Sequence, residues 1–175
     1  MIELVPFGRV DISLVHGLAA SLGKVFRAGV CISSPVQCID RFYDEGRSQY
    51  CSPMILQYLA SNGERHWGGS RTLAIIGEDL YTPILTYVFG EAEFKGKAAI
   101  VSTYRLRPEV YGLAPDRLLV SYRLLKEAVH ELGHTFGLVH CMKLECVMHA
   151  STYVEDLDLK SDKFCTDCTR VVQHD

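Results

Sequence analysis

The chain has no apolar run of about 18 residues, the length that a membrane-spanning helix requires. Its first residues contain neither the basic stretch nor the apolar core of a secretory signal peptide, so we expect a cytoplasmic protein. Lysines and arginines are scattered through the sequence, and the net charge is −3. These features give no support for nucleic acid or an anionic membrane as a partner.

Motifs of several common enzyme classes are also absent. The sequence has no glycine-rich dinucleotide motif, no P-loop and no serine-nucleophile motif. It has no internal repeat, low-complexity segment or linker either. With 175 residues, of which 48% are hydrophobic and 22% are charged, the composition is that of an ordinary globular domain. We therefore expect residues 1–175 to form a single domain around one sizeable core.

Short apolar and β-branched runs predict five strands, at residues 2–7, 30–32, 72–76, 87–94 and 98–104. The third of these runs is continuously apolar, which is typical of a central parallel strand. The last two are separated by a short connection around Gly96, which favours an antiparallel hairpin. We therefore predict an α/β fold with a mixed, mostly parallel, twisted sheet of about five strands and an antiparallel edge strand.

Apolar residues at helical spacing predict helices over residues 11–26, 52–62 and 116–136. The longest of these helices is expected to turn one apolar stripe towards the sheet, made of Leu118, Tyr122, Leu125, Val129, Leu132 and Phe136. Short helices are expected near 151–159 and after Cys168. The polar or glycine-rich stretches are predicted to be irregular, and these are residues 36–50, 64–70 and 77–83.

The chemistry is concentrated in residues 130–140, which read HELGHTFGLVH. His130 and His134 are four residues apart, so a helix places both imidazoles on one face, where they can bind the same zinc ion. Gly137 can adopt a left-handed conformation and end the helix, and the turn then brings His140 up as a third ligand. Three protein ligands leave the fourth zinc position open for water or substrate. Glu131 is placed to accept a proton from that water.

A second constellation follows immediately. Cys165 and Cys168 form a CxxC pair, and Cys141 and Cys146 are separated by four residues. Four thiolates would form a closed tetrahedral zinc site with a structural role. Two disulfides or four buried thiols are the alternatives, and a reducing compartment disfavours both. The zinc would fasten residues 137–175 to a first part that covers about residues 1–136.

Other marked residues have simpler explanations. Met148 is an ordinary core residue or a methionine that packs beneath the zinc ligands. Cys31, Cys38 and Cys51 have no metal-binding spacing among themselves, so buried or spare thiols are the expected reading.

The pattern HExxHxxGxxH with a following methionine resembles that of the metzincin zinc peptidases. With Cys141, Cys146, Met148, Cys165 and Cys168 added, the chain looks like an archaemetzincin in particular. The stretches 79–81 (DLY) and 88–92 (VFGEA) also resemble that family. The resemblance covers residues 72–168 well and the N-terminal third weakly.

This resemblance implies a compact, metzincin-like zinc-peptidase fold with an active-site helix. It implies two zinc ions: a catalytic ion on His130, His134 and His140, and a structural ion on the four cysteines. It makes Met148 the residue of the Met-turn, and it implies an antiparallel edge strand along the cleft, near residues 88–93. Substrate contacts are then expected at Phe89, Gly90 and Glu91.

Some metzincins have a tyrosine two positions after the Met-turn methionine, but Ala150 occupies that position here. His149 and Tyr153 are the nearby candidates for its role. This departure leaves the second group that stabilises the oxyanion unidentified.

The function predicted from these features is hydrolysis of peptide bonds in a peptide or protein substrate by a monomeric zinc peptidase. One alternative is an aminopeptidase or dipeptidase, whose cleft would need an acidic anchor for a free amino terminus, such as Glu91, Glu93 or Asp79. Another alternative is a non-catalytic, zinc-stabilised interaction module. The presence of Glu131 argues against that module, because structural zinc does not need a general base.

Overall fold

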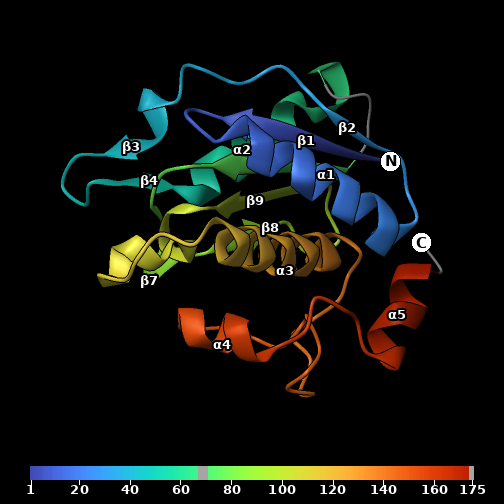
Figure 1. Ribbon diagram of the computed structural model, residues 1–175. Helices are drawn as coiled ribbons and strands as arrows, with labels where there is room; N and C mark the ends of the chain where they lie inside the picture. Colours follow the sequence, from blue (N-terminus) through green and yellow to red (C-terminus); the bar gives the residue numbers. More distant parts are fainter. Residues whose placement is uncertain (67–70, 174–175) are drawn as a thin grey trace.

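The computed structural model describes residues 1–66 and 71–173, with side chains described except at positions 62–70. The central element is a five-stranded sheet in the order β2-β1-β5-β9-β8 (Figure 1). Its strands are β1 (Ile2–Phe7), β2 (Val30–Ile32), β5 (Arg71–Ile76), β8 (Gly90–Ala92) and β9 (Ala98–Ser102). The first four strands in this order pair in parallel, and β8 pairs with β9 antiparallel at the edge. The predicted mixed sheet with an antiparallel edge strand is confirmed.

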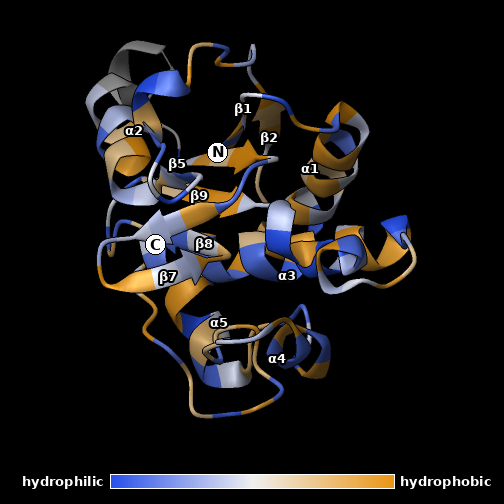
Figure 2. Ribbon diagram, turned by 90° about the vertical axis from the view of Figure 1, so that its left-hand side faces the viewer, coloured by the Kyte–Doolittle hydropathy of each residue, from blue (hydrophilic) through white to orange (hydrophobic). Residues whose placement is uncertain are grey.

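Helices cover both faces of this sheet (Figures 1 and 2). On one face lie α1 (Ile12–Phe26) and α3 (Arg117–Thr135), and on the other lies α2 (Ser52–His66). Alternate residues of β1 enter the two cores: Leu4 packs on the α1 and α3 side, and Phe7 packs on the α2 side. The central strands are hydrophobic on both faces because both faces are covered (Figure 2).

A second, smaller sheet was not predicted. It has the order β3-β4-β6-β7 and is formed by β3 (Tyr43–Asp44), β4 (Gln49–Cys51), β6 (Leu80–Thr82) and β7 (Leu85–Val88). These strands lie partly in 36–50 and 77–83, which were expected to be irregular, because such short polar strands carry no clear two-residue periodicity. The strand expected at 87–94 is divided between the two sheets, as β7 and β8.

Two further expectations about helices are wrong. The second helix does not stop at residue 62 but continues to His66, because a glycine inside a helix costs only about 1 kcal/mol. The apolar stripe of α3 does not face the sheet along its whole length, because Leu118 is 84% exposed. In the first turns of α3, the buried apolar side chains are instead those of Val120 and Leu124. The predicted glycine-rich loop at 64–70 falls partly within α2, and the rest lies outside the described residues.

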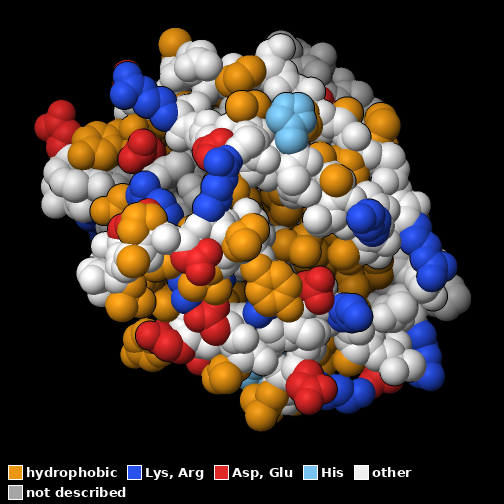
Figure 3. All heavy atoms as spheres, in the orientation of Figure 1, with side chains coloured by type: hydrophobic (Ala, Val, Ile, Leu, Met, Phe, Trp, Pro, Cys, Tyr) orange, Lys and Arg blue, Asp and Glu red, His pale blue; other side chains and the backbone are white. Residues whose placement is uncertain are grey.

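The remaining chain contributes no strand up to residue 173. It contains α4 (Val154–Leu159) and α5 (Thr166–Gln173), and three single-turn 3-10 helices lie earlier, at Asp40–Phe42, Tyr104–Leu106 and Pro108–Tyr111. Among the described residues, no helix combines the length and hydropathy that crossing a bilayer demands. On the face shown in Figure 3, acidic and basic side chains are interspersed, as the scattered charges of the sequence suggest.

Candidate metal centres and cleft

The three predicted histidines converge at the end of α3. His130 and His134 lie one turn apart on the helix, with their Nε2 atoms 3.1 Å from each other. Gly137 follows with a φ of +85°, the left-handed conformation expected of it, and the chain turns back. The ring of His140 then lies 5.2 Å from that of His130 and 5.0 Å from that of His134, between centroids. One candidate ligand atom from each ring lies within 4.8 Å of the others.

The other nitrogen of two rings has a partner that fixes the ring. His130 Nδ1 lies 2.8 Å from the carbonyl oxygen of Val147, and His134 Nδ1 lies 2.7 Å from that of Leu138. A ring that donates from Nδ1 keeps Nε2 free as a metal ligand. Burial lowers the pKa of all three histidines, which favours the neutral imidazoles that a metal requires. Zinc–nitrogen bonds of about 2.0–2.1 Å give a tetrahedral edge of about 3.3 Å, so the donor set fits zinc.

Glu131 is buried between the helix and the edge strand, with 6% of the residue exposed. Burial raises its pKa well above the usual value, the neighbouring Glu127 raises it further, and Lys160 opposes them. A side chain at Gly90 would put its Cβ 2.6 Å from Glu131 Cγ and 2.7 Å from the carbonyl oxygen of Ile100. The close approach of β8 to Glu131 therefore depends on glycine at this position.

A buried lysine lies beneath the histidines and was not predicted. Lys160 follows α4, its side chain is 1% exposed, and its Nζ lies 3.5 Å from Glu127 Oε1. The same Nζ lies 3.1 Å from the carbonyl oxygen of His149 and 3.4 Å from His130 Nδ1. Lys160 thus joins α3 to the chain that returns beneath it. No local motif marks this residue, because its partners are far from it in sequence.

Two more contacts fasten α4 to α3. Arg123 donates from Nε to Asp158 at 2.8 Å, and the buried Lys126 donates to the carbonyl oxygen of Leu157 at 2.6 Å. Cationic side chains therefore hold α4 against α3 in addition to the buried apolar residues Val154 and Leu157, which belong to the same core as α3.

Met148 packs directly against α3, next to Gly133. It is fully buried, and a Cβ added to Gly133 would come 2.4 Å from its sulfur. The backbone N–H of Cys141 donates to the carbonyl oxygen of Met148 at 2.9 Å, which ties the third-ligand loop to this turn. The packing agrees with the position expected of a Met-turn residue, and its role remains an expectation.

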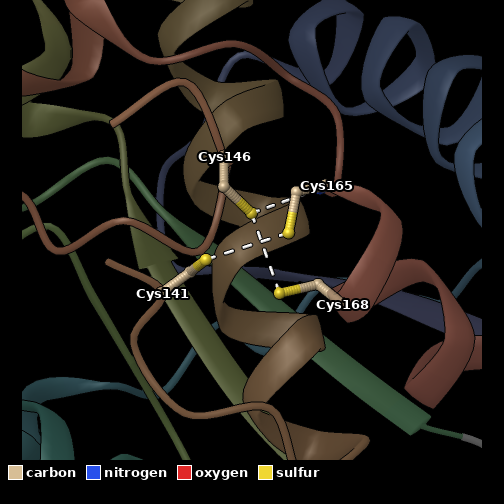
Figure 4. Close-up of side chains that lie close together, drawn as sticks. All are labelled: Cys141, Cys146, Cys165 and Cys168. Carbon is tan, nitrogen blue, oxygen red and sulfur yellow. Dashed lines mark hydrogen bonds between the residues drawn. The ribbon is translucent and has the colours of Figure 1, made fainter. Parts of the chain in front are cut away.

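The four predicted cysteines meet at a common centre (Figure 4). The sulfur of Cys141 lies 3.8 Å from that of Cys165, and the sulfur of Cys146 lies 3.8 Å from that of Cys168. A tetrahedron with zinc–sulfur bonds of about 2.3 Å has an edge of about 3.8 Å, whereas a disulfide has a bond of about 2.05 Å. Hydrogen bonding by the backbone N–H of Cys168 lowers the pKa of Cys165 to about 7. The set fits a structural zinc.

The spare cysteines join neither centre. Among the described residues, the groups of three or more possible ligands are the four cysteines and the three histidines. Cys31 and Cys38 are exposed, and Cys51 is buried at the end of β4.

A cleft of about 820 Å³ opens over the histidines and Glu131. Phe89, Gly90 and Glu91, which were expected to contact the substrate, are among the residues that line it, and the strand β8 forms one of its edges. A second cavity of about 750 Å³ lies at the carboxyl ends of β1, β5 and β9. That cavity contains none of the predicted ligands, so we place the candidate active site in the first cleft.

The three acidic residues considered as anchors for the free amino terminus of a substrate have different surroundings. Asp79 is held by Arg105 through two contacts of 2.7 Å, and Glu93 accepts from backbone N–H groups of the turn that follows β8. Of the three, Glu91 is the one in the cleft lining.

The two candidates that replace the missing tyrosine differ in position. His149 Nδ1 lies 2.9 Å from the carbonyl oxygen of Cys141 and outside the cleft lining, which favours a positioning role. Tyr153 lines the cleft together with Ala150, and it is 63% exposed.

Comparisons with known proteins agree with this geometry. A family model described as peptidase family M54 matches residues 61–174, which is more than half of the chain. The archaemetzincin of Methanocaldococcus jannaschii is 38% identical over 169 residues, which cover 96% of this chain and 90% of that relative. The archaemetzincin of Pyrococcus furiosus is 38% identical over 178 residues, covering 99% and 92%.

Solved structures are similar over nearly the whole chain. The crystal structure of an archaemetzincin from Archaeoglobus fulgidus has a TM-score of 0.83 at 35% identity, covering 98% of this chain and 99% of that one. The structure of a zinc-dependent peptidase from Methanocorpusculum labreanum has a TM-score of 0.86 at 27% identity, covering 98% and 100%.

Proposed function

The chain belongs to peptidase family M54, the archaemetzincins, and from this we propose how the zinc metallopeptidase cleaves its substrate. We propose that His130, His134 and His140 hold the catalytic zinc and that Glu131 is the general base. A zinc ion there supplies Lewis-acid activation of the attacking water and of the scissile carbonyl. The observation that carries this proposal is the convergence of the three imidazoles beside a buried carboxylate, on the floor of one cleft.

Glu131 would accept the proton of the attacking water and then deliver it to the leaving amine. Its position against Gly90 supports this role, because the contact holds the carboxyl group between the histidines and the edge strand. The substrate would lie along β8 and extend the sheet as an additional strand. Contacts with Phe89, Gly90 and Glu91 follow from that placement.

The second zinc would bind Cys141, Cys146, Cys165 and Cys168 and would have a structural role. Because Cys141 directly follows His140, this ion would hold the loop that supplies the third catalytic ligand. Met148 would support the same loop from below. The count of two ions and the monomeric state belong to the proposal.

The experiment is a comparison of wild-type protein with Glu131→Gln on a peptide library, with zinc measured in both. We expect Glu131→Gln to retain its zinc and to lose hydrolysis by about 10²–10⁴-fold, the usual contribution of a general base. Unchanged hydrolysis with zinc fully bound would show that Glu131 has been assigned wrongly.

Trimming of short peptides from a free amino terminus remains the second candidate, because Glu91 lies in the cleft. The non-catalytic module has less support, since a zinc-stabilised interaction domain requires neither an open cleft nor a buried carboxylate beside the histidines.

A further inference from the structure

The wall of the cleft above the edge strand contains a small polar recess. Glu91 pairs with Ile100, which belongs to the core on the α2 side, so the side chain of Glu91 points to the opposite face from Gly90. There it accepts a hydrogen bond from the hydroxyl of Ser52, the first residue of α2. The recess therefore lies on the opposite side of β8 from Glu131, within the same cleft, where alternate side chains of a bound strand would point.

Thr82 supplies an unused polar atom in the same wall. The residue is 8% exposed, it lines the cleft at the end of β6, and its Oγ1 is buried without a hydrogen-bond partner within the described part of the chain. Buried hydroxyl groups in folded proteins nearly always have a partner. A polar atom left free beside a cleft is therefore an indication of a ligand.

The cleft as a whole also has more acidic than basic side chains in its lining. The lining includes three carboxylates and, among the described residues, no lysine or arginine. Of these carboxylates, Glu127 is paired with Lys160, and Glu131 lies beside the three histidines. The contacts of Glu91, by contrast, include no cation. Burial raises the pKa of Glu91, although the hydrogen bond from Ser52 opposes that effect. A substrate cation would relieve the electrostatic cost of burying this carboxylate.

We propose that Glu91 and Thr82, with the buried Ser52 holding the carboxylate of Glu91 in place, form a specificity subsite that receives a basic side chain, lysine or arginine, close to the scissile bond. This inference rests on the proposed function, because it places the peptide along β8. An ammonium or guanidinium group has several N–H donors, which the carboxylate of Glu91 and the free Oγ1 of Thr82 can accept.

A free amino terminus has the same chemistry, and the shape of the cleft decides between the two. The lining continues past Glu91 in both directions, to Phe89 on one side and to Ala92 and Phe94 on the other. A bound chain can therefore pass the recess rather than end there, which favours an internal basic residue.

The test uses zinc-loaded protein and peptides that are acetylated and amidated, identical except for one position that holds lysine, arginine, glutamine or glutamate. We expect the wild type to cleave the lysine and arginine peptides with the highest kcat/KM. Glu91→Gln should lower kcat/KM for these peptides by about 10- to 100-fold, as expected for hydrogen bonds to a charged group, and should lower it much less for the glutamine peptide. Thr82→Val should produce a smaller loss of about threefold to tenfold.

Glu93→Gln is the matched control, since Glu93 is two residues away on the same segment but lies outside the cleft lining. It should retain wild-type kcat/KM for every peptide. Zinc content and circular dichroism of each variant exclude misfolding as the cause of a change. Glu91→Lys should move the preference towards the glutamate peptide.

A measurement of peptide binding distinguishes a failure of this inference from a failure of the proposed function. Titration calorimetry with Glu131→Gln should give a lower Kd for the lysine peptide than for the glutamine peptide, and adding Glu91→Gln should remove the difference. Wild-type cleavage with the same preference in Glu91→Gln would overturn the subsite alone. Cleavage that requires a free amino terminus, whatever the side chain, would overturn it in favour of an amino-terminal anchor. Absence of any cleavage would overturn the proposed function, and the binding difference would still decide the subsite.

Discussion

We predict that the contributions of Lys160 and Glu127 to the free energy of unfolding depend on each other. Both side chains are buried, at 1% and 5% exposure. Lys160→Met leaves the carboxylate of Glu127 buried without its cation, and breaking a buried pair in this way costs about 3–5 kcal/mol. The contact of Lys160 with the carbonyl oxygen of His149 is lost in the same variant.

The double variant Lys160→Met with Glu127→Gln removes both charges at once. Its loss in free energy of unfolding should be about 1–3 kcal/mol smaller than the sum of the losses in the two single variants. A difference of that size is typical of residues in contact. Urea unfolding at a fixed free zinc concentration measures all four proteins, because bound metal itself contributes to stability.

A matched control is the exposed pair of Lys143 and Asp167, whose side chains are 57% and 66% exposed. Lys143→Met should change stability by at most about 0.5 kcal/mol. Additive effects of the Lys160 and Glu127 variants, to within about 0.5 kcal/mol, would refute the reasoning that the two charges depend on each other.

Three further predictions concern the site. Gly90→Ala should lower kcat by about 10²-fold in steady-state assays with zinc content unchanged, because the new methyl group displaces Glu131. Elemental analysis of Cys165→Ser should find one zinc ion fewer than in the wild type, for which two are proposed, and metal binding at His140 should be weaker; a zinc content equal to that of the wild type would contradict the four-cysteine site. The preference for a basic residue should fall as the pH drops through the raised pKa of Glu91, because the protonated carboxyl no longer attracts a cation, and a preference that is independent of pH from 7 down to about 4 would contradict this.

Local chemistry made the candidate metal ligands predictable. The spacing of His130 and His134 follows from the helical repeat, and Gly137 marks the left-handed turn that returns His140 to them. The four cysteines are similarly placed by two short spacings. In each case the ligands lie within a short stretch, and chain geometry leaves few alternatives.

Long-range packing made the rest unpredictable. Lys160 resembles a surface lysine in the sequence, and its burial depends on where α4 lies against α3. Leu118 has the spacing of a core residue, but Val120 and Leu124 occupy the buried positions in the first turns of α3, and Leu118 remains exposed. The recess of Glu91, Thr82 and Ser52 brings together three elements that no sequence spacing connects.

The lack of any strand in residues 137–173 has a consequence for how the protein unfolds. Both sheets are complete without this region, but its buried side chains, such as Val147, Met148 and Leu157, belong to the same core as α1 and α3, and cationic contacts add to that packing. Opening of this region would expose those side chains but leave the hydrogen bonds of both sheets intact. Inactivation by heat or chelation would then precede global denaturation, and the protein could regain activity by closing one segment rather than by refolding the whole chain.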